Sequence, residues 1–149
     1  MLRHVVPGLV LCALLGPAAM PAQEPQNEAG AFAAVVALLR HRPEASDSMR
    51  FAPDSATMFR EFVRCQPGGG SATVCSLVSD KPVIMVRVQL RSPTTAAVEV
   101  RYYQMMRAPC PIGPRYDAPV IDFARKESLT LGYADGHWKP TGRWTVVEC

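Results

Sequence analysis

Few side chains in this sequence have the chemistry or the spacing of a catalytic or metal-binding group. Its three histidines are His4, His41 and His137, and its five cysteines are widely separated. His41 ends a predicted helix, where a cationic side chain suits the helix dipole, and His137 follows a predicted turn. No pair of histidines and no acidic cluster has the spacing of a metal site. The sequence therefore predicts no bound metal and no cofactor.

The best arrangement for acid–base catalysis centres on Asp122, which lies in a predicted strand. Such a base needs a carboxylate that points inward and has a raised pKa. A hydroxyl partner could come from Tyr102, Tyr103 or Tyr116. A strand carboxylate more often lies on the solvated face or pairs with a neighbour such as Arg125. Asp122, Tyr102 and His137 are therefore catalytic candidates, and no catalytic residue is assigned.

A second group of residues suits binding. Tyrosine and methionine are common at binding surfaces, and they gather near the end of a predicted strand and in the loop after it. Core packing explains part of this group, because successive side chains of a strand point to opposite faces. The candidates for contact with a ligand are Tyr103, Met105 and Tyr116.

Residues 1–22 have the layout of a cleavable signal peptide. Arg3 and His4 are followed by an apolar stretch over 5–15 and then by small residues. A membrane span needs roughly 20 apolar residues, and prolines and glycines interrupt this stretch. We therefore expect a leader without an anchor, and an exported domain over 23–149 in the periplasm or the extracellular space.

Two alternatives concern the leader. Met20 is larger than usual before a cut at Ala22, so cleavage after Ala19 is the other site. Cys12 would permit a lipoprotein, although Leu11 stands where such a processing site has a small residue.

The charge balance argues against nucleic acid or an anionic membrane as the partner. The chain has 16 basic and 13 acidic residues, and loss of Arg3 with the leader brings the domain closer to neutrality. The domain is long enough for one core and too short for two. Arginine outnumbers lysine 13 to 3, and alanine, proline and glycine are plentiful, which indicates a bacterium with a GC-rich genome.

Four cysteines of the mature chain, in an oxidising compartment, predict two disulfide bonds. They are Cys65, Cys75, Cys110 and Cys149. We favour Cys65 with Cys75, because the glycine-rich loop between them lets its ends meet easily, and this leaves Cys110 for Cys149. The other pairings stay open, and so does a zinc site, although zinc ligands usually come as closely spaced pairs.

Two helices are predicted in the first half of the domain. Asn27 can cap a helix over 28–42. Its apolar stripe, which needs a sheet to cover, consists of Phe32, Val35, Val36 and Leu39. A shorter helix is predicted over 56–64, capped by Asp54 or Ser55, after an extended connection.

Alternating patterns predict strands over 73–78, 83–91, 96–106 and 120–134, and another after residue 136. In the hairpin that turns at Pro93, apolar pairs and opposite charges agree on one register. This register pairs Val86 with Val100, Val88 with Val98, and Arg87 with Glu99.

The last predicted hairpin turns at Asp135–Gly136, a pair of residues typical of two-residue turns. This turn places Tyr133 opposite Trp138. Pro140 interrupts the following strand and indicates a bulge or an edge position. Residues 107–119 contain four prolines and are predicted to form an irregular loop.

A leading amphipathic helix, a short second helix and long antiparallel strands that end in the hairpin from Tyr133 to Lys139 resemble the cystatin-like group of α+β domains. The similarity is closer to small exported members of the nuclear-transport-factor-2-like superfamily, whose last hairpin often has a similar turn. It implies a curved sheet wrapped around a helix, with a conical cavity used for catalysis or ligand binding. It implies no catalytic residue, and the loop over 107–119 and the disulfides depart from the family pattern.

The predicted fold is α+β, a single domain with the first helix and the short second helix packed on a curved antiparallel sheet of about four to five strands, stapled by disulfides. Two functions are compatible with it. We favour a non-catalytic domain that binds a protein, a peptide or a small apolar ligand through the concave side of its sheet or the proline-rich loop. The alternative is a cofactor-independent isomerase or hydrolase of the cone-shaped type with Asp122 as base.

Overall fold

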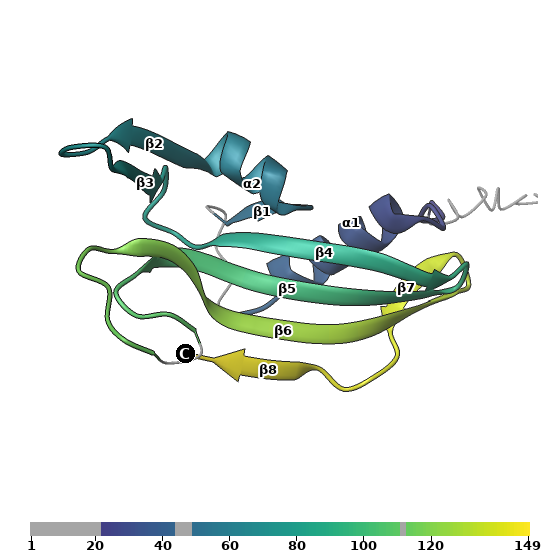
Figure 1. Ribbon diagram of the computed structural model, residues 1–149. Coiled ribbons are helices and arrows are strands. Elements are labelled where there is room, and N and C mark those ends of the chain that lie inside the picture. The colour runs from purple at the N-terminus through teal and green to yellow at the C-terminus, as the bar shows by residue number, and fades with distance from the viewer. Residues whose placement is uncertain (1–21, 44–48, 111–112) are drawn as a thin grey trace, which may run out of the picture.

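The computed structural model describes residues 22–43, 49–110 and 113–149. Within these ranges the chain forms two helices, α1 (Glu28–Arg40) and α2 (Ser55–Phe62). The strands are β1 (Arg50–Ala52), β2 (Val63–Pro67), β3 (Thr73–Leu77), β4 (Val83–Ser92), β5 (Thr95–Met106), β6 (Val120–Ala134), β7 (His137–Pro140) and β8 (Thr145–Glu148) (Figure 1). The predicted signal peptide, apart from Ala22, and the lipidation alternative at Cys12 lie outside the described residues.

Helix α1 begins at the predicted cap. The Oδ1 atom of Asn27 accepts a hydrogen bond from the backbone N–H of Gly30 at 2.9 Å, which satisfies one free donor of the first turn. The helix ends at Arg40, and His41 caps it. It stops short of the predicted end at 42, because Pro43 disfavours the helical conformation for the residue before it.

Helix α2 is capped by Asp54, whose Oδ1 accepts from the N–H of Thr57 at 2.6 Å. The prediction carried this helix to residue 64, and that was wrong. The backbone becomes extended at Val63, and β2 begins there. A β-branched residue favours the extended conformation, and pairing with β3 outweighs the two further helical residues.

The main sheet has the strand order β1-β4-β5-β6-β7 among the described residues, and β8 also pairs with β6. Strand β1 runs parallel to β4, so the sheet is mixed and the prediction of a wholly antiparallel sheet was wrong. The segment predicted as an extended connection, Met49 to Pro53, contains β1, which was not predicted as a strand. Strands β7 and β8 lie in line along β6 and are separated by residues 141–144, which is the interruption predicted at Pro140.

The two predicted hairpin registers are confirmed. Strands β4 and β5 pair Val86 with Val100 and Arg87 with Glu99, and Tyr133 lies opposite Trp138. Asp135 and Gly136 have positive φ angles of 55° and 79°, as the two-residue turn requires. A register shift between Tyr102 and Tyr103 bulges the pairing of β5 with β6, and Figure 1 shows the resulting curl of the long strands.

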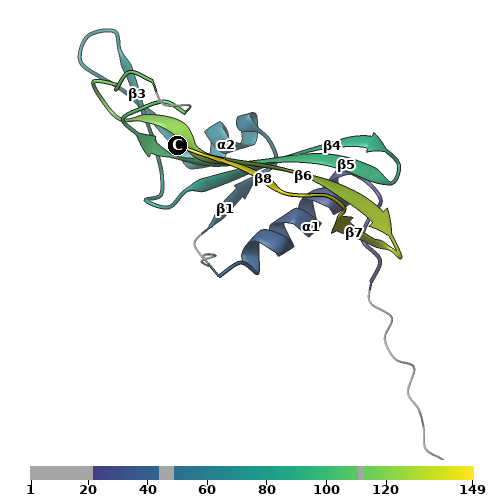
Figure 2. The same cartoon turned by 90° about the horizontal axis from the view of Figure 1, so that it is seen from below.

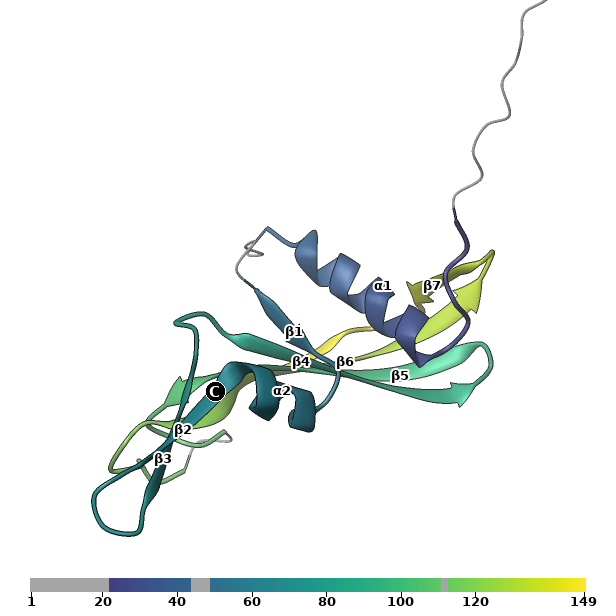
Figure 3. The same ribbon diagram turned by 90° about the horizontal axis from the view of Figure 1, so that it is seen from above.

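The two helices lie on opposite sides of the main sheet (Figures 2 and 3). The buried residues of α1 belong to one core cluster with residues of β4 to β7. Its largest members are Val35, Leu39, Ile84, Val86, Val98, Val100, Leu129, Leu131 and Trp138. A smaller cluster joins Met58 of α2 to Ala52 and Val83 on the other side.

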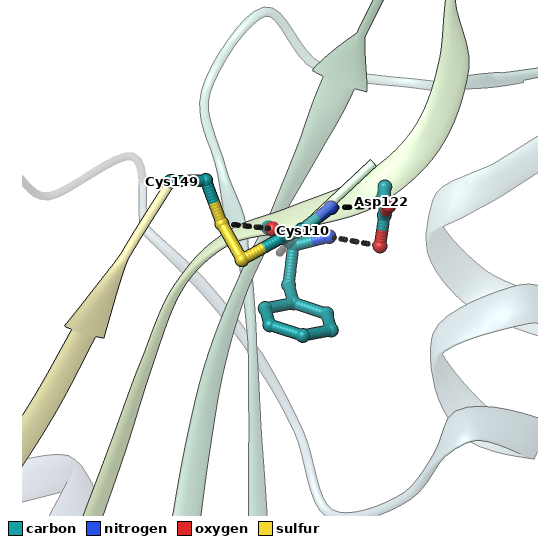
Figure 4. The surroundings of a disulfide bond; sticks show 4 residues. Cys110, Asp122 and Cys149 are labelled. Carbon is teal, nitrogen blue, oxygen red and sulfur yellow. Dashed lines mark hydrogen bonds between the residues drawn. A yellow bond between two sulfur atoms is a disulfide. The ribbon is translucent and has the colours of Figure 1, made fainter. Parts of the chain in front are cut away.

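Both predicted disulfides are present. Cys65 and Cys75 face each other across the separate β2–β3 hairpin, and Cys110 is bonded to Cys149 (Figure 4). Strand β2 was not predicted, because four of its five residues are exposed and it has no buried stripe.

The segment before α1 is tied to the last hairpin. The backbone N–H of Trp138 donates to Glu24 Oε2 at 2.7 Å, and its indole Nε1–H donates to the carbonyl of Pro25 at 3.1 Å. The Tyr133 hydroxyl donates to the carbonyl of Glu24 at 2.7 Å. Gly30 is required beneath this segment, because a Cβ there would overlap the carbonyl oxygen of Pro25. None of the described helices has the length and apolarity of a membrane span.

Candidate functional site

The predicted base, Asp122, holds backbone groups. Its Oδ1 accepts from the N–H of Phe123 at 2.8 Å, and its Oδ2 accepts from the N–H of Cys110 at 3.3 Å (Figure 4). Arg125, its proposed partner, pairs with Glu127 and Glu148 instead. The carboxylate of Asp122 therefore fastens the disulfide-bonded loop to β6.

The other two catalytic candidates lie elsewhere. His137 follows the last turn, and its Nδ1 is 3.9 Å from Oε1 of Glu24. Tyr102 packs against the core cluster that α1 shares with β4 to β7, and its hydroxyl is 3.2 Å from Oε1 of Glu127. No hydrogen bond or ion pair among the described residues joins Asp122, His137 and Tyr102, so they are not brought together as a catalytic set.

The carboxylate that is buried is Glu127, which has no exposed surface. It lies opposite Val100 in the sheet and forms a bidentate pair with Arg42, with both N–O distances 2.8 Å. Sequence reasoning missed it. The alternation of the strand could have indicated it. Glu127 lies on the same face as Leu129 and Leu131, because alternate residues of a strand share a face, and an apolar residue is expected there.

Two arginines and two aromatic rings surround this carboxylate. Arg125 Nε lies 2.8 Å from Glu127 Oε1 and forms an ion pair with it. The Nε–H bond does not point at this oxygen, so the contact is not a hydrogen bond. The guanidinium carbon of Arg42 is 4.4 Å from the ring centre of Trp144, and that of Arg125 is 5.4 Å from the ring of Tyr102. The site connects the end of α1 to β5, β6 and the segment before β8. The name Glu127 cluster is used below for Glu127, Arg42, Arg125, Tyr102 and Trp144.

The electrostatics of the Glu127 cluster favour a fixed ion pair. Burial acts to raise the pKa of Glu127, but the hydrogen bonds and charge of Arg42, the charge of Arg125 and the Tyr102 hydroxyl outweigh it, and the pKa is lowered. Burial and the neighbouring Glu127 charge raise the pKa of Tyr102 to about 12. A carboxylate with a lowered pKa is a weak base, so this arrangement suits structure better than proton transfer.

The outer side of β4 has a different character. Strand β1 pairs with β4 only as far as Met85, and the next residue, Pro53, has no N–H for further pairing. From Val86 to Leu90, no strand among the described residues pairs with this side of β4. We call this stretch the β4 edge.

The backbone groups of the β4 edge point outward at alternate residues. The N–H of Leu90 is directed at Oε1 of Glu28, 3.5 Å away on α1. Since N–H groups of successive strand residues point to opposite sides, those of Val86 and Val88 also point outward. These donors and the matching carbonyls could pair with another strand.

A groove lies beside the β4 edge, between α1 and the start of α2. Its volume is about 640 Å³. Its lining consists of Glu28, Ala29, Phe32, Pro53, Asp54, Val86, Arg87 and Val88. We call it the edge groove. Its apolar floor is formed by the first turns of α1 and the middle of β4.

The predicted binding residues do not line the edge groove. Tyr103 is half-buried against the smaller core cluster of Met58, Ala52 and Val83. The centre of its ring is 6.2 Å from that of Phe123. The N–H of Tyr116 donates to the carbonyl of Arg107 at 2.8 Å. Met105 is exposed at 38% of its surface. Met105 is the most exposed of the three, whereas Tyr103 and Tyr116 are partly exposed, and a binding role for these residues stays a prediction.

In the described ranges, no group of three or more histidine, cysteine, aspartate or glutamate side chains could hold a metal ion. The chain matches no protein-family model, no curated protein and no solved structure at a significant level.

Proposed function

We propose that this protein is an exported, non-catalytic binding domain that takes up an extended segment of a partner polypeptide along the β4 edge. The observation that carries the proposal is the run from Val86 to Leu90 beside the edge groove, which no strand of the described residues pairs on its outer side and where only the N–H of Leu90 has a partner, Glu28. A strand added there would satisfy the outward N–H and C=O groups. Its alternate side chains would enter the groove against Phe32 and Val88.

Polypeptide is the occupant that this chemistry selects. A small apolar ligand would use the groove and leave the backbone donors of β4 to water, whereas a strand uses both. The alternative function, an isomerase or hydrolase with Asp122 as base, has less support, because both oxygens of Asp122 accept backbone N–H groups.

Export is part of the proposal. The layout of residues 1–22 supports it, and two disulfides fit a non-reducing compartment. Amino-terminal sequencing of the protein recovered outside the cytoplasm should begin near Gln23. A start at Met1 would contradict export.

We also propose the finer fold assignment, a helix packed on a curved sheet as in cystatin-like and nuclear-transport-factor-2-like domains. The core cluster shared by α1 and strands β4 to β7 supports it.

The binding proposal is tested with a random peptide library displayed on phage and selected on the purified exported protein. Amide NMR shifts on adding a selected peptide should concentrate at Val86, Val88 and Leu90. Val88→Pro removes an outward N–H and should weaken binding ~5-fold or more, since a backbone hydrogen bond contributes about 1 kcal/mol. Val88→Thr keeps the N–H and should keep most of the affinity.

The matched control lies on the opposite edge of the sheet. The N–H of Cys149 donates inward to the carbonyl of Ala124, so the N–H of Val146 on β8 points outward. Val146→Pro should leave peptide binding unchanged. Shifts centred on β8, or equal losses in the two proline variants, would overturn the assignment to β4.

A further inference from the structure

The middle of the sheet face turned away from α1 carries an excess of positive charge. Directly opposed residues share a face of a sheet, and the register places Arg87, Arg101 and Lys126 on this one. Arg91 and Arg143 line the groove above it. We call this region the open face. Glu99 is its one carboxylate among the described residues.

That carboxylate is already paired. Glu99 Oε1 is 2.8 Å from Arg101 Nη2, and Oε2 is 2.6 Å from Lys126 Nζ. Arg87 lies directly opposite Glu99 in the register, yet it forms no ion pair with it. In the part of the chain that the structure describes, Arg87, Arg91 and Arg143 have no acidic partner. Three guanidinium groups thus face the solvent together.

These three arginines line one groove of about 500 Å³. Arg87 and Arg91 approach it from β4, and Arg143 approaches from the segment before β8. Polar side chains on the floor and wall, namely Gln89, Ser128, Thr130 and Thr145, add amide and hydroxyl donors. The groove is polar, and it lies across the sheet from the core packed by α1.

Guanidinium groups bind carboxylate and phosphate oxygens through paired N–H donors. Glu99 also lines this groove, but its carboxylate is paired with Arg101 and Lys126. The three arginines have no ion-pair partner among the described residues and repel one another, and an anion that bridges them would remove this repulsion. From the groove, the unpaired arginines and the hydroxyl donors, we propose that the open face binds a small ligand bearing two or more carboxylate or phosphate groups. A single charge would engage one arginine, whereas several charges span the groove.

This site does not depend on peptide binding at the β4 edge. Arg87 lines both the edge groove and the groove on the open face. Arg91 and Arg143 line only the groove on the open face. Substitution of these two arginines therefore separates the two proposals.

The test is calorimetric titration of the exported protein with pyrophosphate in one arm and citrate in the other, at low salt. We expect saturable binding of at least one probe. The double variant Arg91→Gln with Arg143→Gln should weaken it at least ~10-fold, because each lost charge-assisted hydrogen bond is among the stronger kind. Arg115→Gln removes an exposed arginine outside the groove and should change affinity by less than ~2-fold. Amide shifts should centre on Ser128 and Thr145.

The two arms identify the source of the charge. Preference for pyrophosphate assigns phosphate groups, and preference for citrate assigns carboxylates. Equal losses in the double variant and in Arg115→Gln would mean that the chain attracts anions without a site, and would overturn the proposal. Binding only to vesicles of anionic phospholipid, with neither small probe bound, would also overturn it.

Discussion

Glu127 and Glu99 each face two cationic side chains, yet they lie on opposite faces of the main sheet. Glu127 has no exposed side-chain surface, whereas Glu99 keeps 24% of its side-chain surface exposed. Arg42 meets Glu127 through two parallel hydrogen bonds. Glu99 shares its two oxygens between Arg101 and Lys126 in contact with water.

The difference separates stability from recognition. A buried carboxylate must be fully paired, since removal of its partners leaves an uncompensated charge in the core. An exposed pair is screened by water and contributes little, so the open face can tolerate arginines without partners. The same residue types therefore fix α1 on one face and remain free for a ligand on the other.

The largest effect is expected for Glu127→Gln. This change keeps the shape of the side chain but leaves Arg42 and Arg125 without their common anion. We expect a loss of about 3 kcal/mol in the free energy of unfolding, the lower end of the range for broken buried pairs, because Arg42 is partly exposed. Urea denaturation measures this loss. A loss below ~1 kcal/mol would mean that the ion pairs of Glu127 contribute no more to stability than an exposed surface pair does.

The pH dependence follows from the lowered pKa of Glu127, whose ordinary value is near 4.5. A carboxyl with a lower pKa in the folded state stabilises the fold above its unfolded pKa, and this contribution is lost as pH falls through the folded pKa. The stability gap between the native protein and Glu127→Gln should therefore shrink in acid. Denaturation midpoints at about pH 7 and about pH 3 would check this. An unchanged gap would contradict the ionised assignment.

A smaller effect is expected for Tyr102→Phe. The hydroxyl is 3.2 Å from Glu127 Oε1 and 3.2 Å from Arg42 Nη1. Its removal should lower the free energy of unfolding by about 1 kcal/mol, the typical contribution of a hydrogen bond to stability. The comparison with Glu127→Gln shows whether the arginines or the hydroxyl dominate the pairing. A loss equal to that of Glu127→Gln would give Tyr102 the main role.

The smallest effect is expected for Glu99→Gln. Its partners remain solvated, so thermal denaturation should detect a change below ~1 kcal/mol. Anion binding by the open face should strengthen in this variant, because the change removes the one carboxylate that the described residues place on that face. Weaker binding would mean that Glu99 positions Arg101 and Lys126 for the ligand.

The sequence predicted the elements whose signals are local. Asn27 and Asp54 cap helices by bonds within three residues. The turn at Pro93, the apolar pairs and the opposite charges together predicted the register of Val86 with Val100. The Cys65–Cys75 bond followed from a short flexible loop. Each of these depends on neighbours in the chain or on one hairpin.

The parts that sequence reasoning missed depend on distant neighbours. Arg42 and Glu127 are 85 residues apart, and nothing in either local pattern indicates the other. Strand β1 was missed because three residues give no alternation to detect, and it forms only because β4 offers a partner. The positive charge of the open face depends on the pairing of β4, β5 and β6, which places Arg87, Arg101 and Lys126 on one face.

The segment that lies over Gly30 affects the order of folding. Glu24 and Pro25 are held by Tyr133 and Trp138, which follow them by 109 to 114 residues. During synthesis these early residues must wait for almost the whole chain before their partners exist, and contacts so distant in sequence form slowly. The segment of Glu24 and Pro25 would thus stay undocked until the last hairpin is made, so the first and last described parts of the domain complete their packing in one late step.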